Sequence, residues 1–87
     1  MASYEIRFAA SVSRDLRGIP PRDVRRILAR VDTLKVNPRP PGCEKLSAQE
    51  RYRVRQGNYR IIYEIADGAL TVLVVRVGHR RDVYESR

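Results

Sequence analysis

The sequence has little of what several classes of protein need. Its 87 residues include a single cysteine, Cys43, so no disulfide can form within the chain, and a reducing compartment is expected. No apolar run approaches the length of a membrane span, and the N-terminus has no hydrophobic signal segment. We therefore expect one small domain, residues 1–87, in the cytoplasm and away from membranes.

Residues that bind metals or form hydrolytic triads are also scarce. There is one histidine, His79, and the 10 Asp and Glu residues are scattered along the chain. This pattern predicts neither a zinc motif nor a two-metal nuclease cluster. Cys43 follows a Pro-Gly loop without a neighbouring basic partner, and we interpret it as inert. No glycine-rich phosphate loop is evident, so we expect no metal and no small-molecule cofactor.

Positive charge is what the chain has in excess. It contains 18 Lys and Arg against 10 Asp and Glu, a net charge of +8, and only Lys35 and Lys45 among the 18 are not arginine. Such a balance favours an anionic partner, either nucleic acid or an acidic protein, without choosing between them. The arginine bias fits phosphate recognition, but the codon usage of a GC-rich genome would produce it too.

The first 50 residues predict one strand followed by two helices. Tyr4–Phe8 alternates as a short strand does, and residues 9–17 are a helix candidate with Ser11 as a candidate N-cap. Residues 22–36 show the apolar spacing of an amphipathic helix, which Asn37-Pro38 ends. Its apolar positions are Val24, Ile27, Leu28, Val31 and Leu34.

Residues 51–84 form three β-rich runs separated by turns at Gln56-Gly57 and Asp67-Gly68, which is typical of an antiparallel meander. Two-residue loops at both turns would place Arg53 directly opposite Arg60. With the helical hairpin packed on one face of this twisted antiparallel sheet, the order becomes β-α-α-β-β-β. We therefore predict the α+β fold class.

Side chains alternate along a strand, so this register divides the meander into two faces. The apolar face would carry Tyr59, Ile61, Tyr63, Ile65, Leu70, Val72 and Val74. The other, which we call the arginine face, would carry Arg53, Arg55, Arg60, Ile62, Glu64 and Thr71. Helices would cover the apolar face and leave the arginine face open, either as a phosphate site or as a solvated basic surface. A three-residue loop at 56–58 would instead turn Arg53 and Arg55 to the opposite side.

Two segments together resemble a known family. Residues 59–65 (Tyr-Arg-Ile-Ile-Tyr-Glu-Ile) and 77–84 (Val-Gly-His-Arg-Arg-Asp-Val-Tyr) are similar to the RelE/ParE superfamily of toxins from bacterial type II toxin–antitoxin systems, most closely to its RelE branch. The resemblance extends over nearly the whole chain, including Asp15-Leu16 and Asn37-Pro38, and implies a RelE-like fold.

The resemblance also implies an activity and partners. RelE-type members are ribosome-dependent endoribonucleases, or mRNA interferases, that cut mRNA in the A site and thereby inhibit translation. The ribose 2′-hydroxyl attacks the adjacent phosphate, and no metal takes part. The expected partners are the ribosome, mRNA and a cognate acidic, RelB-like antitoxin, whose charge would suit the basic toxin.

Individual site residues follow from the same resemblance. Arg60 would stabilise the phosphate, Arg80 would assist the leaving group, and Tyr84 would stack on or orient the RNA. Arg53 and Arg55 fall where the best-known members carry two lysines, one of them proposed as general base, and arginine is too basic for that role. His79 is the substitute that we expect, although a solvated imidazole is the alternative. The expected RNA-binding residues are Arg53, Arg55, Arg81 and Lys45.

Two other interpretations use the same fold. The chain could act like ParE-type members, which inhibit DNA gyrase by binding and have no nuclease chemistry. It could also be a basic binding module without activity, since the two lysines are missing. The set of Arg60, Arg80 and Tyr84 favours the RelE-type reading, because ParE-like members tend not to retain it.

Overall fold

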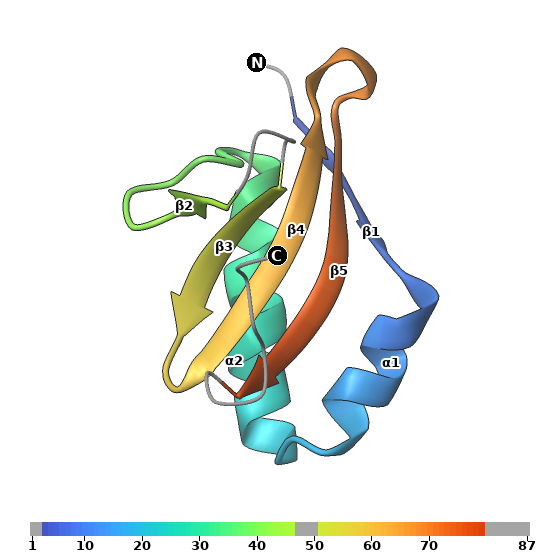
Figure 1. The fold of residues 1–87 in the computed structure, drawn as a ribbon, viewed down its shortest axis with the longest axis vertical. Helices are drawn as coiled ribbons and strands as arrows, with labels where there is room; N and C mark the ends of the chain where they lie inside the picture. The colour runs from blue at the N-terminus through green and yellow to red at the C-terminus, as the bar shows by residue number, and fades with distance from the viewer. Residues whose placement is uncertain (1–2, 47–50, 80–87) are drawn as a thin grey trace.

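A computed structural model describes residues 3–46 and 51–79, in which two helices pack on one face of a single sheet (Figure 1). The elements in chain order are β1 (Glu5–Phe8), α1 (Ala10–Arg17), α2 (Pro21–Asp32), β2 (Glu44–Lys45), β3 (Arg51–Gln56), β4 (Tyr59–Ala66) and β5 (Thr71–His79). The strand order across the sheet is β1-β5-β4-β3-β2. The predicted α+β class, with a helical hairpin on one face, is confirmed. In the described part of the chain, no helix combines the length and the apolar character needed to cross a membrane.

The sheet is mixed rather than wholly antiparallel. β1 runs parallel to β5, from Glu5 opposite Thr71 to Phe8 opposite Val74, and the two-residue strand β2 adds an edge beside β3. A short hairpin dictates antiparallel pairing, but no hairpin joins β1 to β5. The sequence therefore held no local signal for the direction of this pair.

The helices begin and end near their predicted limits. Ser11 is not the N-cap of α1, because Ala9 occupies that position. The second helix ends at Asp32 instead of Val36, and the chain continues as a 3₁₀ turn over Thr33–Lys35. Pro21 opens α2, where its missing N–H costs no hydrogen bond.

The first hairpin turns one residue later than predicted. Its loop is Gly57-Asn58, and Gly57 has a positive φ of 60°, which glycine adopts without steric cost. Glycine at the first loop position is the preference of a type II′ turn, and glutamine would be strained there. Arg55 therefore lies opposite Arg60, and the predicted pairing of Arg53 with Arg60 is wrong.

The second hairpin has a longer loop than predicted. Residues 67–70 connect Ala66 to Thr71, and Leu70 lies exposed in this loop with a φ of 48° instead of on the apolar face. In both hairpins the pairing differs from the prediction by two residues. A shift of two residues leaves every strand side chain on its predicted face, because the alternation has a period of two. Arg53, Arg55 and Arg60 accordingly share one face, as predicted.

A β-bulge in β5 changes the alternation once. Tyr63 lies opposite Val74, but the next pair is Ile62 opposite Arg76, so Val75 is an extra residue on β5. Beyond the bulge, Arg76 and Gly78 fall on the arginine face. Val77 and His79 fall on the side that the helices cover, and Val77 is buried there.

The core lies between the helices and the apolar face. Its buried residues come from α1, α2 and the central strands, and include Val12, Ile27, Val31, Val54, Ile61, Tyr63, Val72 and Val74. Tyr63 is fully buried, and its hydroxyl donates a hydrogen bond of 2.7 Å to the carbonyl of Pro38. Burial raises the pKa of Tyr63 far above its ordinary value, so the phenol stays a donor.

An exposed network ties the β4–β5 loop to the N-terminal segment. The Asp67 carboxylate accepts hydrogen bonds from both terminal nitrogens of Arg39, at 3.1 and 2.9 Å, and from the Tyr4 hydroxyl at 2.8 Å. The bonds from Arg39 and then Tyr4 lower the pKa of Asp67 to about 2. Ionised Asp67 therefore stabilises the folded loop.

Stability should fall as the pH is lowered from about 4 towards 2. A carboxyl with a depressed folded-state pKa stabilises the fold above its ordinary value of 3.8 and loses that contribution as pH falls through about 2. We expect Asp67→Asn, which cannot ionise, to show a shallower decrease in Tm over this window than wild type. Superimposable Tm–pH curves for the two proteins would mean that the network contributes nothing.

Candidate nucleic-acid interface

The arginine face carries a row of cations across three strands. The register places Arg51, Arg53 and Arg55 from β3, Arg60 from β4 and Arg76 from β5 on this side of the sheet. Arg55 lies directly opposite Arg60, next to the Gly57-Asn58 turn. Like charges directly opposite each other in a sheet repel unless an anion lies between them.

Carboxylates neutralise one part of this row. Arg53 forms an ion pair with Glu44 on β2, and Arg51 pairs with Glu64 on β4. The Arg53 side chain is only 12% exposed, whereas Glu44 is 60% exposed. Within residues 3–46 and 51–79, no carboxylate pairs with Arg55 or Arg76. Positive charge therefore concentrates at the end of the sheet near the Gly57 turn.

A buried apolar residue also lies among the arginines of this face. Ile62 lies between Arg53 and Arg76 in the register and is only 4% exposed, although it is separate from the main core. Ile62 is thus a buried apolar side chain between two arginines of the arginine face.

His79 does not lie on the arginine face. The bulge turns it to the helix side, where its ring meets that of Tyr59 edge-on, with centroids 6.0 Å apart and an interplanar angle of 81°. The Tyr59 hydroxyl donates a 3.2 Å hydrogen bond to Asp23 of α2. Burial and Asp23 raise the pKa of Tyr59, which therefore remains protonated. The bulge thus separates His79 from the arginines of the open face.

Lys45 also lies apart from the arginines. It is opposite Tyr52 in the register, so its side chain leaves the sheet edge on the helix side, while neighbouring Glu44 faces the arginines. Arg80, Arg81 and Tyr84, the remaining predicted site residues, lie outside the described residues. The structure thus brings together Arg53, Arg55 and Arg60 of the predicted set and adds Arg76, which the sequence did not single out.

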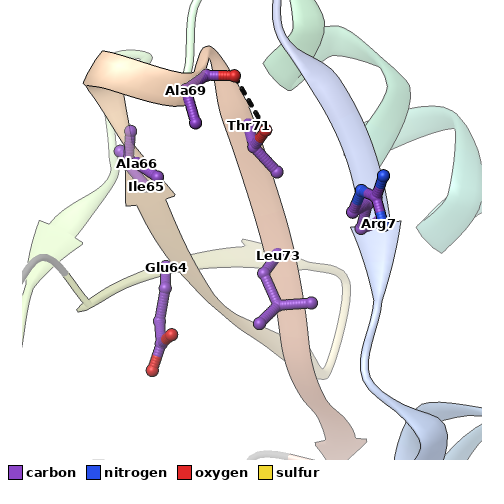
Figure 2. Close-up of a pocket in the computed structure, with 7 residues that line it drawn as sticks. All are labelled: Arg7, Glu64, Ile65, Ala66, Ala69, Thr71 and Leu73. Atoms are coloured by element: carbon purple, nitrogen blue, oxygen red, sulfur yellow. Dashed lines mark hydrogen bonds between the residues drawn. The ribbon is translucent and has the colours of Figure 1, made fainter.

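The opposite end of the same face holds a pocket of about 420 Å³ (Figure 2). Its lining is Arg7, Glu64, Ile65, Ala66, Ala69, Thr71 and Leu73. At the loop end of the pocket, the Thr71 hydroxyl donates a 2.9 Å hydrogen bond to the carbonyl of Ala69. Sequence reasoning missed this pocket, because Arg7 reaches it through the parallel β1–β5 pairing. The face is therefore divided into a cationic end and a more apolar end.

The described residues hold no group of three or more His, Cys, Asp or Glu side chains placed to bind a metal ion. At the end of the arginine face near the Gly57 turn, the described residues offer guanidiniums to a ligand, while Glu44 and Glu64 pair with Arg53 and Arg51. Several guanidiniums on one open surface are suited to the phosphates of a nucleic acid.

Comparison with known proteins places the chain in a family. The model described as "ParE toxin of type II toxin-antitoxin system, parDE" matches residues 6–84. Toxin RelG of Mycobacterium tuberculosis is 35% identical over 91 residues, which cover 93% of this chain and 95% of that protein.

Solved structures agree with this assignment. A chain of the toxin–antitoxin complex RelBE2 from Mycobacterium tuberculosis matches with a TM-score of 0.81 and 31% identity, covering 92% of this chain and 94% of the other. The archaeal RelE–RelB complex from Pyrococcus horikoshii gives a TM-score of 0.81 at 25% identity, with 93% and 99% covered. The chain therefore belongs to the RelE/ParE superfamily of toxins from type II toxin–antitoxin systems.

Proposed function

We propose that this toxin is an endoribonuclease that cleaves mRNA in the ribosomal A site and so inhibits translation. The observation that carries the proposal is the placement of Arg55 opposite Arg60, with Arg76 on the same open face. The RelE-type names of its relatives support the same reading.

The arginines suit a reaction that needs charge stabilisation. When the ribose 2′-oxygen attacks the adjacent phosphorus, the new P–O bond forms as the bond to the 5′-oxygen breaks. The products end in a 2′,3′-cyclic phosphate and a 5′-hydroxyl. Extra negative charge develops on the non-bridging oxygens, where Arg60 and Arg55 would donate hydrogen bonds. Arg53 and Arg76 would hold the flanking backbone.

Roles for the remaining residues stay predictions. Arg80 would protonate or stabilise the leaving 5′-oxygen, Tyr84 would orient the RNA, and Arg81 and Lys45 would add backbone contacts. His79 could serve as general base only if the RNA reaches around the end of β5, because the His79 ring lies on the helix side of the sheet. If His79→Ala cleaves at the wild-type rate with the same pH dependence, the proton is taken by a group of the RNA or the ribosome.

End-group analysis on ribosomes tests this proposal. Purified toxin is added to ribosomes with an occupied P site and a vacant A site, and the cleaved mRNA is mapped and its termini identified. We expect cuts within the A-site codon that leave a cyclic phosphate and a 5′-hydroxyl. Intact message, or products with 5′-phosphates, would contradict the proposed reaction.

Inhibition of DNA gyrase is the second candidate, because the matching family model carries the ParE name. It requires a surface that binds a protein but no groups that act on RNA. The arginine pair near the Gly57 turn would then serve only as a binding patch. Cleavage of mRNA by the purified toxin would favour the first candidate. Inhibition of gyrase without cleavage of mRNA would favour the second.

The second partner that we propose is a cognate acidic antitoxin; the matched structures are complexes of a toxin with its antitoxin. Two adjoining pockets of about 340 and 480 Å³ lie between β1 and the helices and share Phe8 and Leu28. These two large apolar residues are 46% and 40% exposed and lie together in both pockets. An apolar groove on a chain of net charge +8 suits an amphipathic antitoxin helix with acidic flanks.

Leu28→Asp should weaken antitoxin binding roughly tenfold or more, because it places a charge in an apolar contact that must lose water. Val36→Asp is the matched control, since Val36 is 73% exposed and lines neither pocket. Titration calorimetry in an Arg60→Ala background, which should be non-toxic, measures both. Equal losses of affinity in the two variants would contradict the proposal that the antitoxin binds in this groove.

A further inference from the structure

β1 covers only the first half of the β5 edge. The two strands pair from Thr71 to Val74, and the Ala9 N–H makes the last backbone bond, 2.8 Å to the carbonyl of Val74. The chain then turns into α1, which lies beside the rest of β5 (Figure 1). The backbone groups of β5 beyond Val74 that face this side need partners other than a strand.

Side chains of α1 supply those partners. The Val77 N–H donates a 3.0 Å hydrogen bond to the Asp15 carboxylate, a partly buried contact between residues 62 positions apart. One helical turn earlier, the Ser11 hydroxyl approaches the carbonyl of Val75 at 3.5 Å. Residues four apart lie on the same face of a helix. Ser11 and Asp15 therefore both contact the part of the β5 edge that β1 does not cover.

The Asp15 bond is specific for the bulged register. Backbone groups of a strand point alternately to its two neighbours, and the carbonyls of Leu70 and Val74 point towards β1. Without the extra residue at Val75, the N–H of residue 76 would point to this side instead of that of Val77. A carboxylate at this position therefore favours the bulge over the regular ladder.

The bulge decides which side chains reach the arginine face. With it, Arg76 lies opposite Ile62 on that face, and Val77 is buried. Without it, Val77 would be exposed and Arg76 would point into the apolar layer beneath the helices, which is unfavourable for a charge.

We infer that Asp15 is a positioning residue: by binding the Val77 N–H, its carboxylate holds the bulge that delivers Arg76 to the side of Arg55 and Arg60. The same bulge also determines that Gly78 lies on the arginine face and His79 on the helix side. The effect on cleavage rests on the proposed function, whereas the effect on the register does not.

NMR measures the register directly. In Asp15→Ala, amide exchange at Val77 should accelerate at least tenfold, and the contact between the side chains of Arg76 and Ile62 should weaken, while amides of Ile61 and Tyr63 stay protected. Asp15→Asn should retain most of the protection, since its amide oxygen still accepts a hydrogen bond. Arg14→Ala, on the exposed side of α1, is the control and should match wild type.

Single-turnover cleavage on ribosomes supplies the second readout. Asp15→Ala should lose tenfold or more in rate, and Asp15→Asn should recover most of the rate. Should Asp15→Ala fail to fold, Asp15→Glu, which moves the carboxylate by one methylene, is judged by the same two measurements. Unchanged Val77 exchange in the folded variant would overturn the inference. A changed register in a protein that never cleaves RNA would overturn the proposed function instead.

Discussion

An Arg60→Ala variant should lose growth arrest and at least about 100-fold in single-turnover cleavage, yet unfold at nearly the wild-type temperature. Arg60 is half-buried on the arginine face, where its guanidinium would meet the charge that develops on the phosphate. Removing a donor of this kind commonly costs roughly 10²–10³ in rate. We expect the fold to lose little, because Arg60 lies outside the main core and opposite another arginine, Arg55.

Two matched variants make this result specific. Arg7→Ala removes an exposed arginine from the other end of the same face, where it pairs with Glu5 at 3.4 Å, and should leave cleavage unchanged. Arg60→Lys keeps the charge without the planar pair of donors and should restore only part of the rate. A drop of several degrees in the Tm of Arg60→Ala would identify Arg60 as structural and refute its assignment to the site.

Naked RNA should be cut at least 1,000-fold more slowly than the same message on a programmed ribosome. The arginine face stabilises phosphate charge, but the described residues on it include no lysine or histidine to act as base. The alignment of the 2′-hydroxyl with the scissile bond must then come largely from how the ribosome presents the codon. Orientation alone can supply up to ~7–11 kcal/mol of a barrier.

Naked RNA should nonetheless bind, with an affinity that falls steeply as salt increases, because phosphate contacts release counterions. Arg55→Ala should lower the slope of log K against log salt by roughly 0.7 if it makes one contact to a single strand. Cleavage of naked and ribosome-bound message at similar rates would show that the protein aligns the reacting groups by itself.

Strand alternation explains why the two faces were predictable although neither register was. Both loops differed from the predicted two-residue turns, yet each error displaced the pairing by two residues and left Arg53 and Arg60 on the same side. Gly57 was the decisive residue of the first turn, since only glycine takes its positive φ without strain. Hydrophobic alternation thus predicts on which face of the sheet a side chain lies more securely than it predicts which residue lies opposite it on the next strand.

The bulge at Val75 had a weaker signal. No Gly or Pro marks the extra residue in the run Val-Leu-Val-Val, and the sign of a change was Arg76, which unbroken alternation would place on the apolar face. Its stabilising contact comes from Asp15, 62 positions from Val77. The side on which His79 lies therefore depends on tertiary structure, and so does the presence of Arg76 among the arginines.

The exposure of individual apolar residues on the helices could not be predicted from the sequence either. Leu28 fits the amphipathic pattern of α2 as well as Ile27 or Val31, but it is 40% exposed and lines the groove beside Phe8. The spacing of apolar residues predicts which side of α2 is apolar. How much of that side is buried depends on where α1 and β1 pack.

The most direct measurement runs two assays on one preparation of purified toxin. One follows cleavage of mRNA on ribosomes with a vacant A site, and the other follows supercoiling by DNA gyrase, each with wild type and Arg60→Ala. We predict that wild type cuts the A-site codon, Arg60→Ala does not, and gyrase supercoils normally with both. Inhibited gyrase together with intact ribosome-bound message would contradict the nuclease assignment.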